Sequence, residues 1–145
     1  MHYRVVAVGG GRMKSAALRA ACDDYLSRIR HYAKIEEREV KEEARLLGGG
    51  VIPEDSRLVA LSRRGQPWSS AELAELIGRW EMDGRDVTFA IGGAEALPDE
   101  LIGRAEWTWS LGPLTLPHEL ARVVVYEQLY RAHTIRRGEP YHRGP

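Results

Sequence analysis

The sequence predicts an α/β fold with a mainly parallel sheet and helices on both of its faces. Short apolar runs that end near glycine alternate with longer segments whose apolar residues recur every three or four positions. A length of 145 residues is typical of one domain. The contents of 43% hydrophobic and 29% charged residues are those of a globular chain with a core. We see no repeat or linker, and therefore expect residues 1–145 to form a single domain.

Four buried strands are predicted where apolar residues run together before a turn. They are Val5–Val8, Leu58–Leu61, Val87–Ile91 and Trp107–Leu111. The first run ends at Gly9-Gly10-Gly11 and the third at Gly92-Gly93, which indicates tight turns. The segment Ala33–Val40 is polar enough to be either an edge strand or the start of a charged loop. Residues 41–56 contain three consecutive glycines, and we expect them to be the most mobile connection.

Four helices are predicted, and each has a start signal. These signals are Ser15, the capping box of Ser69 and Glu72, Pro98, and Pro117. The apolar faces of the first two long helices are Leu18, Cys22, Tyr25 and Ile29, and then Leu73, Leu76, Ile77 and Trp80. Because Cys22 lies on an apolar face, we interpret it as a small buried hydrophobe. The last helix is expected to run to about Arg136, with Gly138 as its C-terminal stop.

The last predicted helix is apolar over a wide arc. The residues of that arc are Leu120, Val123, Val124, Val125, Leu129, Tyr130, Ala132 and Ile135. One face of a sheet can cover only part of such an arc, because a helix that packs on a single surface needs a narrower apolar stripe. We therefore expect a second copy of the chain to cover the rest, and predict a homodimer.

Composition excludes several classes of protein. The charges of the 21 basic and 21 acidic residues cancel, so the chain is not a protein that binds nucleic acid through a large positive net charge. Both ends of the chain are nevertheless locally basic. A single cysteine excludes an intramolecular disulfide and a multi-cysteine zinc site. No apolar run approaches the roughly 20 residues of a membrane span. The apolar run near the N-terminus is too short for a signal peptide, so we expect a cytoplasmic protein with no membrane partner.

Common catalytic motifs do not fit either. The glycines after the first strand lack the spacing of a P-loop or of a dinucleotide fingerprint, since Met13 precedes Lys14-Ser15. The histidines His118, His133 and His142 have no metal-ligand spacing, and we predict no metal. Two loops remain, residues 92–98 and 112–117, which each follow the carboxyl end of a strand, where α/β proteins bind ligands.

Five motifs occur in an order that is specific in combination. They are Val6-Ala7-Val8-Gly9, Asp83–Val87 before Ile91-Gly92-Gly93, Trp109-Ser110-Leu111, Leu114-Thr115-Leu116-Pro117-His118, and Pro140-Tyr141-His142-Arg143. From Val6 to Arg143 the chain resembles the ribosomal RNA large subunit methyltransferase H family, bacterial pseudouridine N3-methyltransferases of the SPOUT superfamily. The Leu-Thr-Leu-Pro-His string and the terminal Tyr-His-Arg are the most specific parts.

This resemblance implies a homodimer with a trefoil knot in the carboxyl-terminal half. It implies a substrate pseudouridine in a stem-loop of 23S ribosomal RNA, methylated at N3 in the assembled ribosome. S-adenosyl-L-methionine would bind in the knot loops. The residues that the resemblance places around this cofactor are Leu61, Gly92, Gly93, Pro113, Leu114, Thr115, Leu116, Pro117 and His118.

The resemblance also implies that the C-terminal tail carries the chemistry. His142 is a possible base for the N3 proton, because histidine is largely neutral at physiological pH. Arg143 could instead stabilise the developing anion on the uracil oxygens. Tyr141 could stack on a splayed base. Which side chain takes the proton stays open, and His118 could simply support the cofactor loop.

One loop departs from the family pattern. The usual Gly-Gly-Pro-Glu-Gly is Gly92-Gly93-Ala94-Glu95-Ala96 here. Loss of proline loosens a loop, and Ala96 disfavours a positive φ where the family has glycine. A lower cofactor affinity is one consequence. The alternative function is a non-catalytic module that binds RNA or the ribosome and retains the fold.

Overall fold

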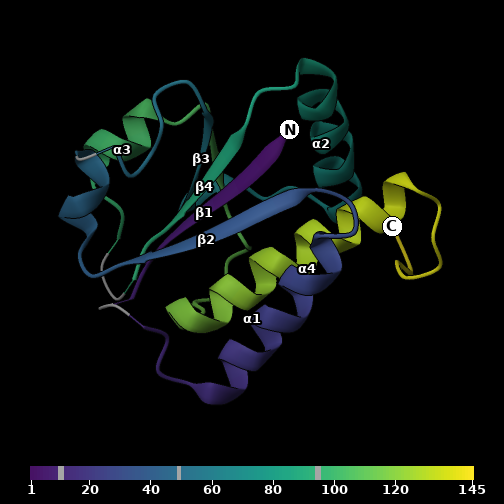
Figure 1. Cartoon of the computed structure of the whole chain (residues 1–145), viewed down its shortest axis with the longest axis horizontal. Coiled ribbons are helices and arrows are strands. Elements are labelled where there is room, and N and C mark those ends of the chain that lie inside the picture. The colour runs from purple at the N-terminus through teal and green to yellow at the C-terminus, as the bar shows by residue number, and fades with distance from the viewer. Residues whose placement is uncertain (10–11, 49, 94–95) are drawn as a thin grey trace.

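The computed structural model in Figure 1 describes residues 1–9, 12–48, 50–93 and 96–145. In this part of the chain, five strands form one sheet in the order β2-β1-β4-β3-β5, and all neighbouring pairs are parallel. The strands are β1 (His2–Val8), β2 (Lys34–Val40), β3 (Arg57–Gln66), β4 (Val87–Ile91) and β5 (Trp107–Trp109). The helices are α1 (Ala16–Ile29), α2 (Ser70–Asp83), α3 (Asp99–Arg104) and α4 (His118–Arg136), with a short 3-10 helix, η1 (Glu43–Leu47).

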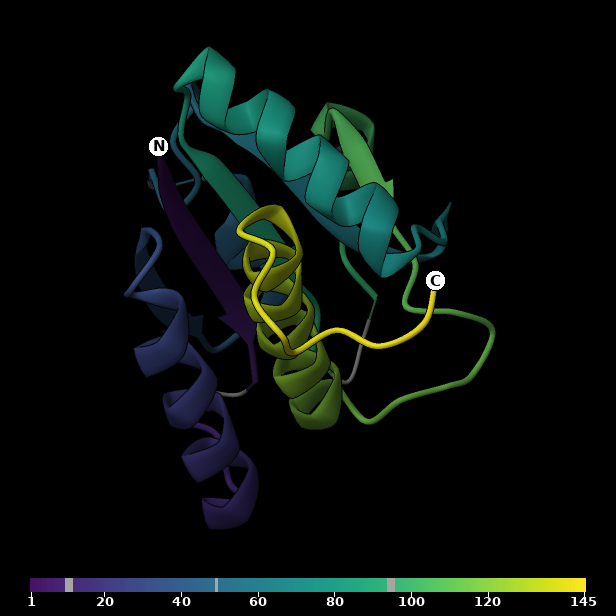
Figure 2. The ribbon, with the colours of Figure 1, turned by 90° about the vertical axis from the view of Figure 1, so that its right-hand side faces the viewer.

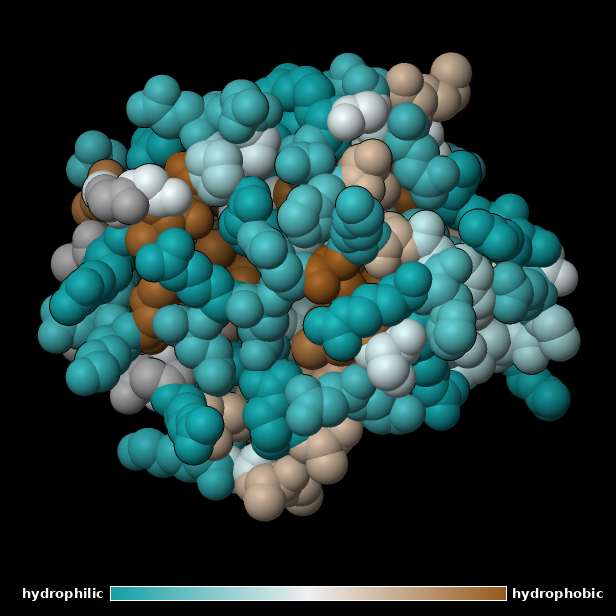
Figure 3. All heavy atoms as spheres, in the orientation of Figure 1, coloured by the Kyte–Doolittle hydropathy of each residue, from teal (hydrophilic) through white to brown (hydrophobic). Residues whose placement is uncertain are grey.

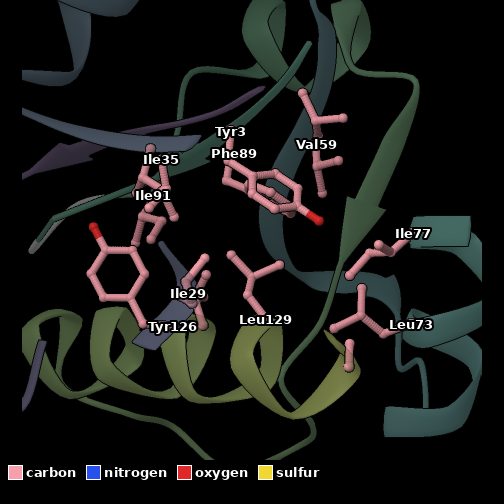
Figure 4. Packing of buried hydrophobic residues seen from close by; sticks show 14 of the residues in the cluster. Tyr3, Ile29, Ile35, Val59, Leu73, Ile77, Phe89, Ile91, Tyr126 and Leu129 are labelled. Carbon is pink, nitrogen blue, oxygen red and sulfur yellow. The ribbon is translucent and has the colours of Figure 1, made fainter. Parts of the chain in front are cut away.

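The sheet separates two apolar layers, as the prediction of helices on both faces requires. On one face, α1, α2 and α4 pack on the sheet around a core that includes Tyr3, Phe89 and Leu129 (Figure 4). On the other face, Leu46 of η1 and Leu101 of α3 cover the strands. Sheets made of parallel strands need both faces covered, because the crossover connections place helices on each side. The α/β fold class is therefore confirmed.

Local signals in the sequence begin and end the helices as predicted. The Ser15 hydroxyl accepts a hydrogen bond from the Leu18 amide at 3.2 Å, and both bonds of the Ser69–Glu72 capping box are formed. Pro117 precedes the first residue of α4. Gly138 has a φ of +66°, the left-handed conformation that commonly ends helices.

Three strands differ from their predicted extents. β1 begins at His2, because residues 2–4 pair with β2 although they are not a continuous apolar run. β3 continues to Gln66, since Trp109 pairs with both Leu61 and Gln66 across an irregularity in the register. β5 has three residues instead of five. These boundaries depend on neighbouring strands, which the sequence pattern does not contain.

The structure decides the question about the segment after α1. Lys34–Val40 is strand β2, which lies at the edge of the sheet and pairs with β1 alone. The connection after it contains η1, and the apolar side chains of Leu46, Val51 and Ile52 are buried against the sheet. These buried side chains pack the connection after β2 onto the sheet, although its three glycines predicted a mobile loop.

Helix α4 has a buried side and an outer side. Val125, Leu129 and Ala132 are buried against the sheet and the helices beside it. The other apolar residues of the predicted arc stay half-buried, namely Leu120, Val123, Val124, Tyr130 and Ile135. Figures 1 and 2 show α4 running alongside α1, while the chain after α4 turns back along the outer side of the helix.

The surface is mostly hydrophilic on the side seen in Figure 3, with hydrophobic atoms showing in the region of η1 and α3. None of the helices in the described ranges is both long and apolar enough to span a membrane. Cys22 is buried, as predicted, and burial raises the pKa of its thiol to about 11.

Candidate cofactor and substrate site

The two predicted ligand loops lie at one edge of the sheet. The strands are parallel, so their carboxyl ends meet at the same edge, and Gly92-Gly93 follows β4 there while residues 110–117 follow β5. This is the edge at which open α/β sheets bind ligands. Leu61 belongs to the same edge, since it is half-buried in β3 and pairs with Trp109 of β5.

Gly93 allows the loop after β4 to approach β1 closely. A Cβ atom at this position would lie 2.8 Å from the carbonyl oxygen of Val8, which is closer than real Cβ atoms come to backbone. Glycine is required here because the two backbones touch, and not for a positive φ. Ala96, where the family pattern has glycine, is not strained, because no non-glycine residue in the described ranges has a positive φ. Ala94 and Glu95 lie outside the described residues.

The loop after β5 is tied to the end of β3. The Ser110 amide donates to the carbonyl oxygen of Gln66 at 2.9 Å, and the Arg63 guanidinium donates to the Thr115 hydroxyl. At Gly65 a Cβ atom would lie 2.5 Å from the Thr108 carbonyl carbon, so residues 61–66 and β5 are in direct backbone contact.

The predicted cofactor residues in the loop after β5 differ in exposure. Pro113, Leu114, Thr115 and Pro117 are exposed, whereas Leu116 and His118 are half-buried. Leu114 is 76% exposed and is one of two large hydrophobic side chains found exposed in the described part of the chain. The loop therefore presents apolar side chains to solvent.

The start of α4 is held by a carboxylate. Both oxygens of Glu119 accept backbone hydrogen bonds, from Lys14 at 2.8 Å and from Ser15 at 3.0 Å. These bonds lower the pKa of Glu119, because they favour the ionised carboxylate. They connect the helix that follows the loop after β5 with the segment that begins α1.

A buried ion-pair cluster lies one turn further along α4. Arg122 is 1% exposed, and its Nη1 atom donates to Glu39 of β2 at 2.7 Å. Glu37 of β2 accepts from Tyr126 and, at 2.6 Å, from Arg19 of α1. Sequence reasoning missed this cluster. The spacing of Arg122 was the available signal. It lies three and seven positions before the apolar residues Val125 and Leu129, so a helix places all three on the same buried face.

The C-terminal tail is bound to the outer side of α4. The Tyr141 hydroxyl donates to Glu127 at 2.7 Å, and the Tyr141 ring meets the Tyr130 ring edge-on at 4.7 Å between centroids. The Arg131 guanidinium lies 4.7 Å from the centre of the Tyr141 ring. Burial, followed by the bond to Glu127, raises the pKa of Tyr141, so this hydroxyl stays protonated at neutral pH.

His142 has a defined tautomer in this arrangement. Its Nδ1 atom lies 3.1 Å from Arg131 Nη1, and its Nε2 atom lies 3.1 Å from the backbone oxygen of Pro145. A guanidinium can only donate, so Nδ1 accepts and Nε2 carries the proton. The one lone pair of the neutral ring is therefore engaged with Arg131. The Arg143 side chain is exposed.

The predicted site residues thus form two groups. Leu61, Gly92, Gly93 and residues 113–118 lie at the carboxyl edge of the sheet, and Tyr141 and His142 are bonded to the middle of α4. No hydrogen bond between described residues joins the two groups. Likewise, no group of three or more His, Cys, Asp or Glu side chains in the described ranges could hold a metal ion.

An all-parallel α/β sheet with candidate ligand loops at its carboxyl edge occurs in many protein families, so comparison with known sequences assigns the class of protein. The family model described as "Predicted SPOUT methyltransferase" matches residues 1–142. The chain belongs to the SPOUT methyltransferase family.

Relatives agree with this assignment, and a solved structure has the same fold. The chain is 43% identical to ribosomal RNA large subunit methyltransferase H of Anaeromyxobacter sp. (strain Fw109-5), over 99% of this chain and 100% of that protein. It is 42% identical to the protein of the same name from Sorangium cellulosum (strain So ce56), over 95% and 98%. A probable methylase family protein from Haemophilus influenzae Rd KW20 has the same fold, with a TM-score of 0.63, 11% identity, and coverage of 98% and 70%.

Proposed function

We propose that this protein transfers a methyl group from S-adenosyl-L-methionine to N3 of a pseudouridine in a stem-loop of 23S ribosomal RNA, within the assembled ribosome. The observation that carries the proposal is the similarity to proteins named ribosomal RNA large subunit methyltransferase H over essentially the whole chain. The loops after β4 and β5 lie with the end of β3 at the carboxyl edge of the sheet, which supports the same function because α/β proteins commonly bind ligands at that edge.

The cofactor would be held by Leu61, Gly92, Gly93 and the segment from Pro113 to His118. The structure of the SpoU methyltransferase AviRb from Streptomyces viridochromogenes, in complex with AdoMet, has the same fold at a TM-score of 0.50 and 12% identity, over 94% of this chain and 61% of that one. The residues present suit such a group, because glycine backbone is accessible and the leucines provide an apolar surface for adenine. When bound, S-adenosyl-L-methionine supplies an electrophilic methyl group on a sulfonium.

The chain itself would position the base and remove its proton. Methyl transfer is an in-line displacement, so orientation is the main contribution of the protein. His142 would accept the N3 proton at Nδ1 after its bond to Arg131 opens. Arg143 would stabilise the charge that develops on the uracil oxygens, and Tyr141 would stack on the base.

The active protein would be a homodimer. Leu120, Val123 and Val124 stay half-buried on the amino-terminal half of α4, whereas the tail covers Glu127 and Arg131 further along. A second copy that packs on the uncovered half would remove this apolar surface from water. Sedimentation at micromolar concentration tests this, and a monomer under those conditions would contradict it.

The trefoil knot is also a proposal. It is supported by the close backbone contact of residues 61–66 with β5, and by the bond from Arg63 to Thr115 beyond that contact. An experimental electron-density trace through residues 57–118 would test whether the chain passes through a loop. A ribosomal substrate would place the protein in the cytoplasm.

The proposed function is tested by incubating the protein with ribosomes from a strain that lacks its gene, together with a labelled methyl donor. We expect one labelled nucleotide in 23S RNA, a pseudouridine methylated at N3, when the product is mapped by mass spectrometry. A protein that binds ribosomes without transferring the label would be a non-catalytic binding module instead.

A further inference from the structure

A hollow of about 410 Å³ lies where α1 and α4 end, away from the proposed cofactor loops. It is lined by Arg28, His31, Tyr32, Tyr130, Arg137 and Glu139. Its volume falls within the range of about 300–1,000 Å³ that is usual for small-ligand sites. Three of the six lining residues are basic or can become so, two are tyrosines, and one is acidic.

The two arginines of the hollow are held against aromatic rings and not in strong ion pairs. The Arg137 guanidinium lies 5.1 Å from the centre of the Tyr32 ring, and the Arg28 guanidinium lies 5.5 Å from that of Tyr130. Arg28 has an ion pair with Asp24 at 3.2 Å, but both side chains are about half exposed. Exposed pairs of this kind contribute little, so a phosphate could replace the carboxylate at low cost.

The rings of the hollow are fixed in place. Tyr32 stacks on the buried ring of His133 at 5.3 Å between centroids, with an angle of 11° between the planes. The Tyr32 hydroxyl donates to Glu139 at 2.8 Å. Burial, followed by this bond, raises the pKa of Tyr32 to about 12, so the hydroxyl stays a donor. A side chain whose rotamer is already set loses little entropy when a flat ligand stacks on it.

The hollow adjoins the proposed catalytic tail. Tyr130 lines the hollow, and its ring also contacts Tyr141 at 4.7 Å between centroids. Figure 2 shows the tail leaving the end of α4 and passing back along the helix. Helix α4 has 19 residues and is about 28 Å long. On one chain, the hollow and the loops at the start of α4 therefore lie near opposite ends of this helix.

We propose that this hollow binds a nucleotide of the RNA substrate that flanks the methylated one. Its base would lie against the tyrosine and guanidinium planes, and its phosphate would contact Arg28 and Arg137. Single-stranded RNA is commonly recognised by such stacking on aromatic rings and arginine, combined with phosphate contacts. Glu139, the one carboxylate among the lining residues, would accept a hydrogen bond from a base N–H. This inference rests on the proposed function, since it assumes an RNA substrate.

The test compares two double variants that lose the same charge. Arg28→Gln with Arg137→Gln changes the hollow, and Arg79→Gln with Arg104→Gln changes two exposed arginines elsewhere on the surface. The probe is a fluorescein-labelled oligouridylate of twelve nucleotides, whose binding is followed by anisotropy over a series of salt concentrations. We expect the hollow variant to bind about tenfold more weakly. Its slope of log K against log salt should fall by about 1.4, for two lost phosphate contacts on a single strand.

The control variant should bind within twofold of the unchanged protein. Equal loss in both variants, or no loss in the hollow variant, would overturn the inference. Calorimetric titration with S-adenosyl-L-methionine, together with thermal melting, shows whether each variant is folded. A separate assay, methyl transfer to ribosomes from a strain that lacks the gene, tests the proposed function. If the unchanged protein transfers no methyl group, that function fails, whereas the oligouridylate result still decides the inference.

Discussion

The two ends of α4 are held in place by different chemistry. At the amino-terminal end, Glu119 accepts two backbone hydrogen bonds from the segment before α1, and Arg122 is buried in an ion pair with Glu39. At the carboxyl-terminal end, the ring of His133 stacks on Tyr32, and Tyr130 meets the ring of Tyr141. The amino-terminal end thus depends on charge-assisted bonds, whereas the carboxyl-terminal end combines aromatic contacts with ion pairs, such as those of Arg131 with Glu127 and of Arg136 with Glu81.

This difference corresponds to what each end is proposed to do. Charge-assisted hydrogen bonds are directional and strong, which suits the end that would keep the proposed cofactor loop after β5 in one position. Aromatic and cation–π contacts tolerate small displacements and present flat surfaces, which suits an end that would bind bases. The comparison predicts that damage at the first end destabilises the protein, while damage near the second mainly changes catalysis and RNA binding.

The largest expected effect is on turnover, through the tail. We expect His142→Ala and Arg143→Ala to lower turnover about 100- to 10,000-fold if either group serves proton transfer or charge stabilisation. Affinity for S-adenosyl-L-methionine should stay nearly unchanged in calorimetry, because neither side chain lies at the carboxyl edge of the sheet. Arg79→Ala is the control and should keep full turnover. An equal loss of cofactor affinity would show that the tail belongs to the cofactor pocket.

Removal of the buried guanidinium should give the largest loss of stability. Arg122→Ala leaves Glu39 without its nearest ion-pair partner. Breaking a buried pair in this way typically costs about 3–5 kcal/mol. Urea unfolding of both proteins measures the difference. A loss below about 1 kcal/mol would mean that this end of α4 does not depend on its ion pairs.

The aromatic end should make stability depend on pH through His133. Burial lowers the pKa of this ring to about 4 from an ordinary value of 6.5, and the ring shares a 2.9 Å hydrogen bond with the Tyr3 hydroxyl. The folded pKa lies below the unfolded one, so protons bind the unfolded chain more readily. The contribution of His133 is therefore fully present above pH 6.5 and is lost as the pH falls towards 4. Its size is about 3 kcal/mol.

Unfolding free energies measured between pH 7 and pH 4 check the His133 effect. The unfolding free energy should fall less between pH 7 and pH 4 in His133→Gln than in the unchanged protein. In His31→Gln, at an exposed position, it should fall as much as in the unchanged protein. The same fall of the unfolding free energy in all three proteins would show that groups other than His133 cause the acid sensitivity.

The smallest of these effects should come from the backbone contact between the loop after β4 and β1. Gly93→Ala introduces a methyl group where the Val8 carbonyl oxygen would be 2.8 Å away. We expect a loss of about 1–3 kcal/mol in stability, as for overpacking, together with weaker binding of S-adenosyl-L-methionine. Gly103→Ala is the matched control, since nothing lies within 4 Å of that position and alanine favours the helix. Equal stability of the two variants would show that the loop moves freely away from β1.

Much of the local structure could be predicted because it depends on neighbours in the chain. The capping box of Ser69 and Glu72 and the stop at Gly138 each involve residues only a few positions apart, and all of them formed as expected. The family could be predicted from its motifs, which are also local strings. The glycines of the loop after β4 were identified as a turn, although the reason for Gly93, its contact with Val8, was not visible.

The sequence by itself determined the alternation of strands and helices, the helix ends and the family, since these depend on spacing and on near neighbours. Only the tertiary structure decided the order of strands, the extension of β3 to Gln66 and the pairing of β2 at the edge. It also decided the burial of Arg122 and the bond of Glu119 to an amide 105 residues earlier in the chain. Such contacts join residues far apart in sequence, and their strength depends on burial that no local pattern specifies.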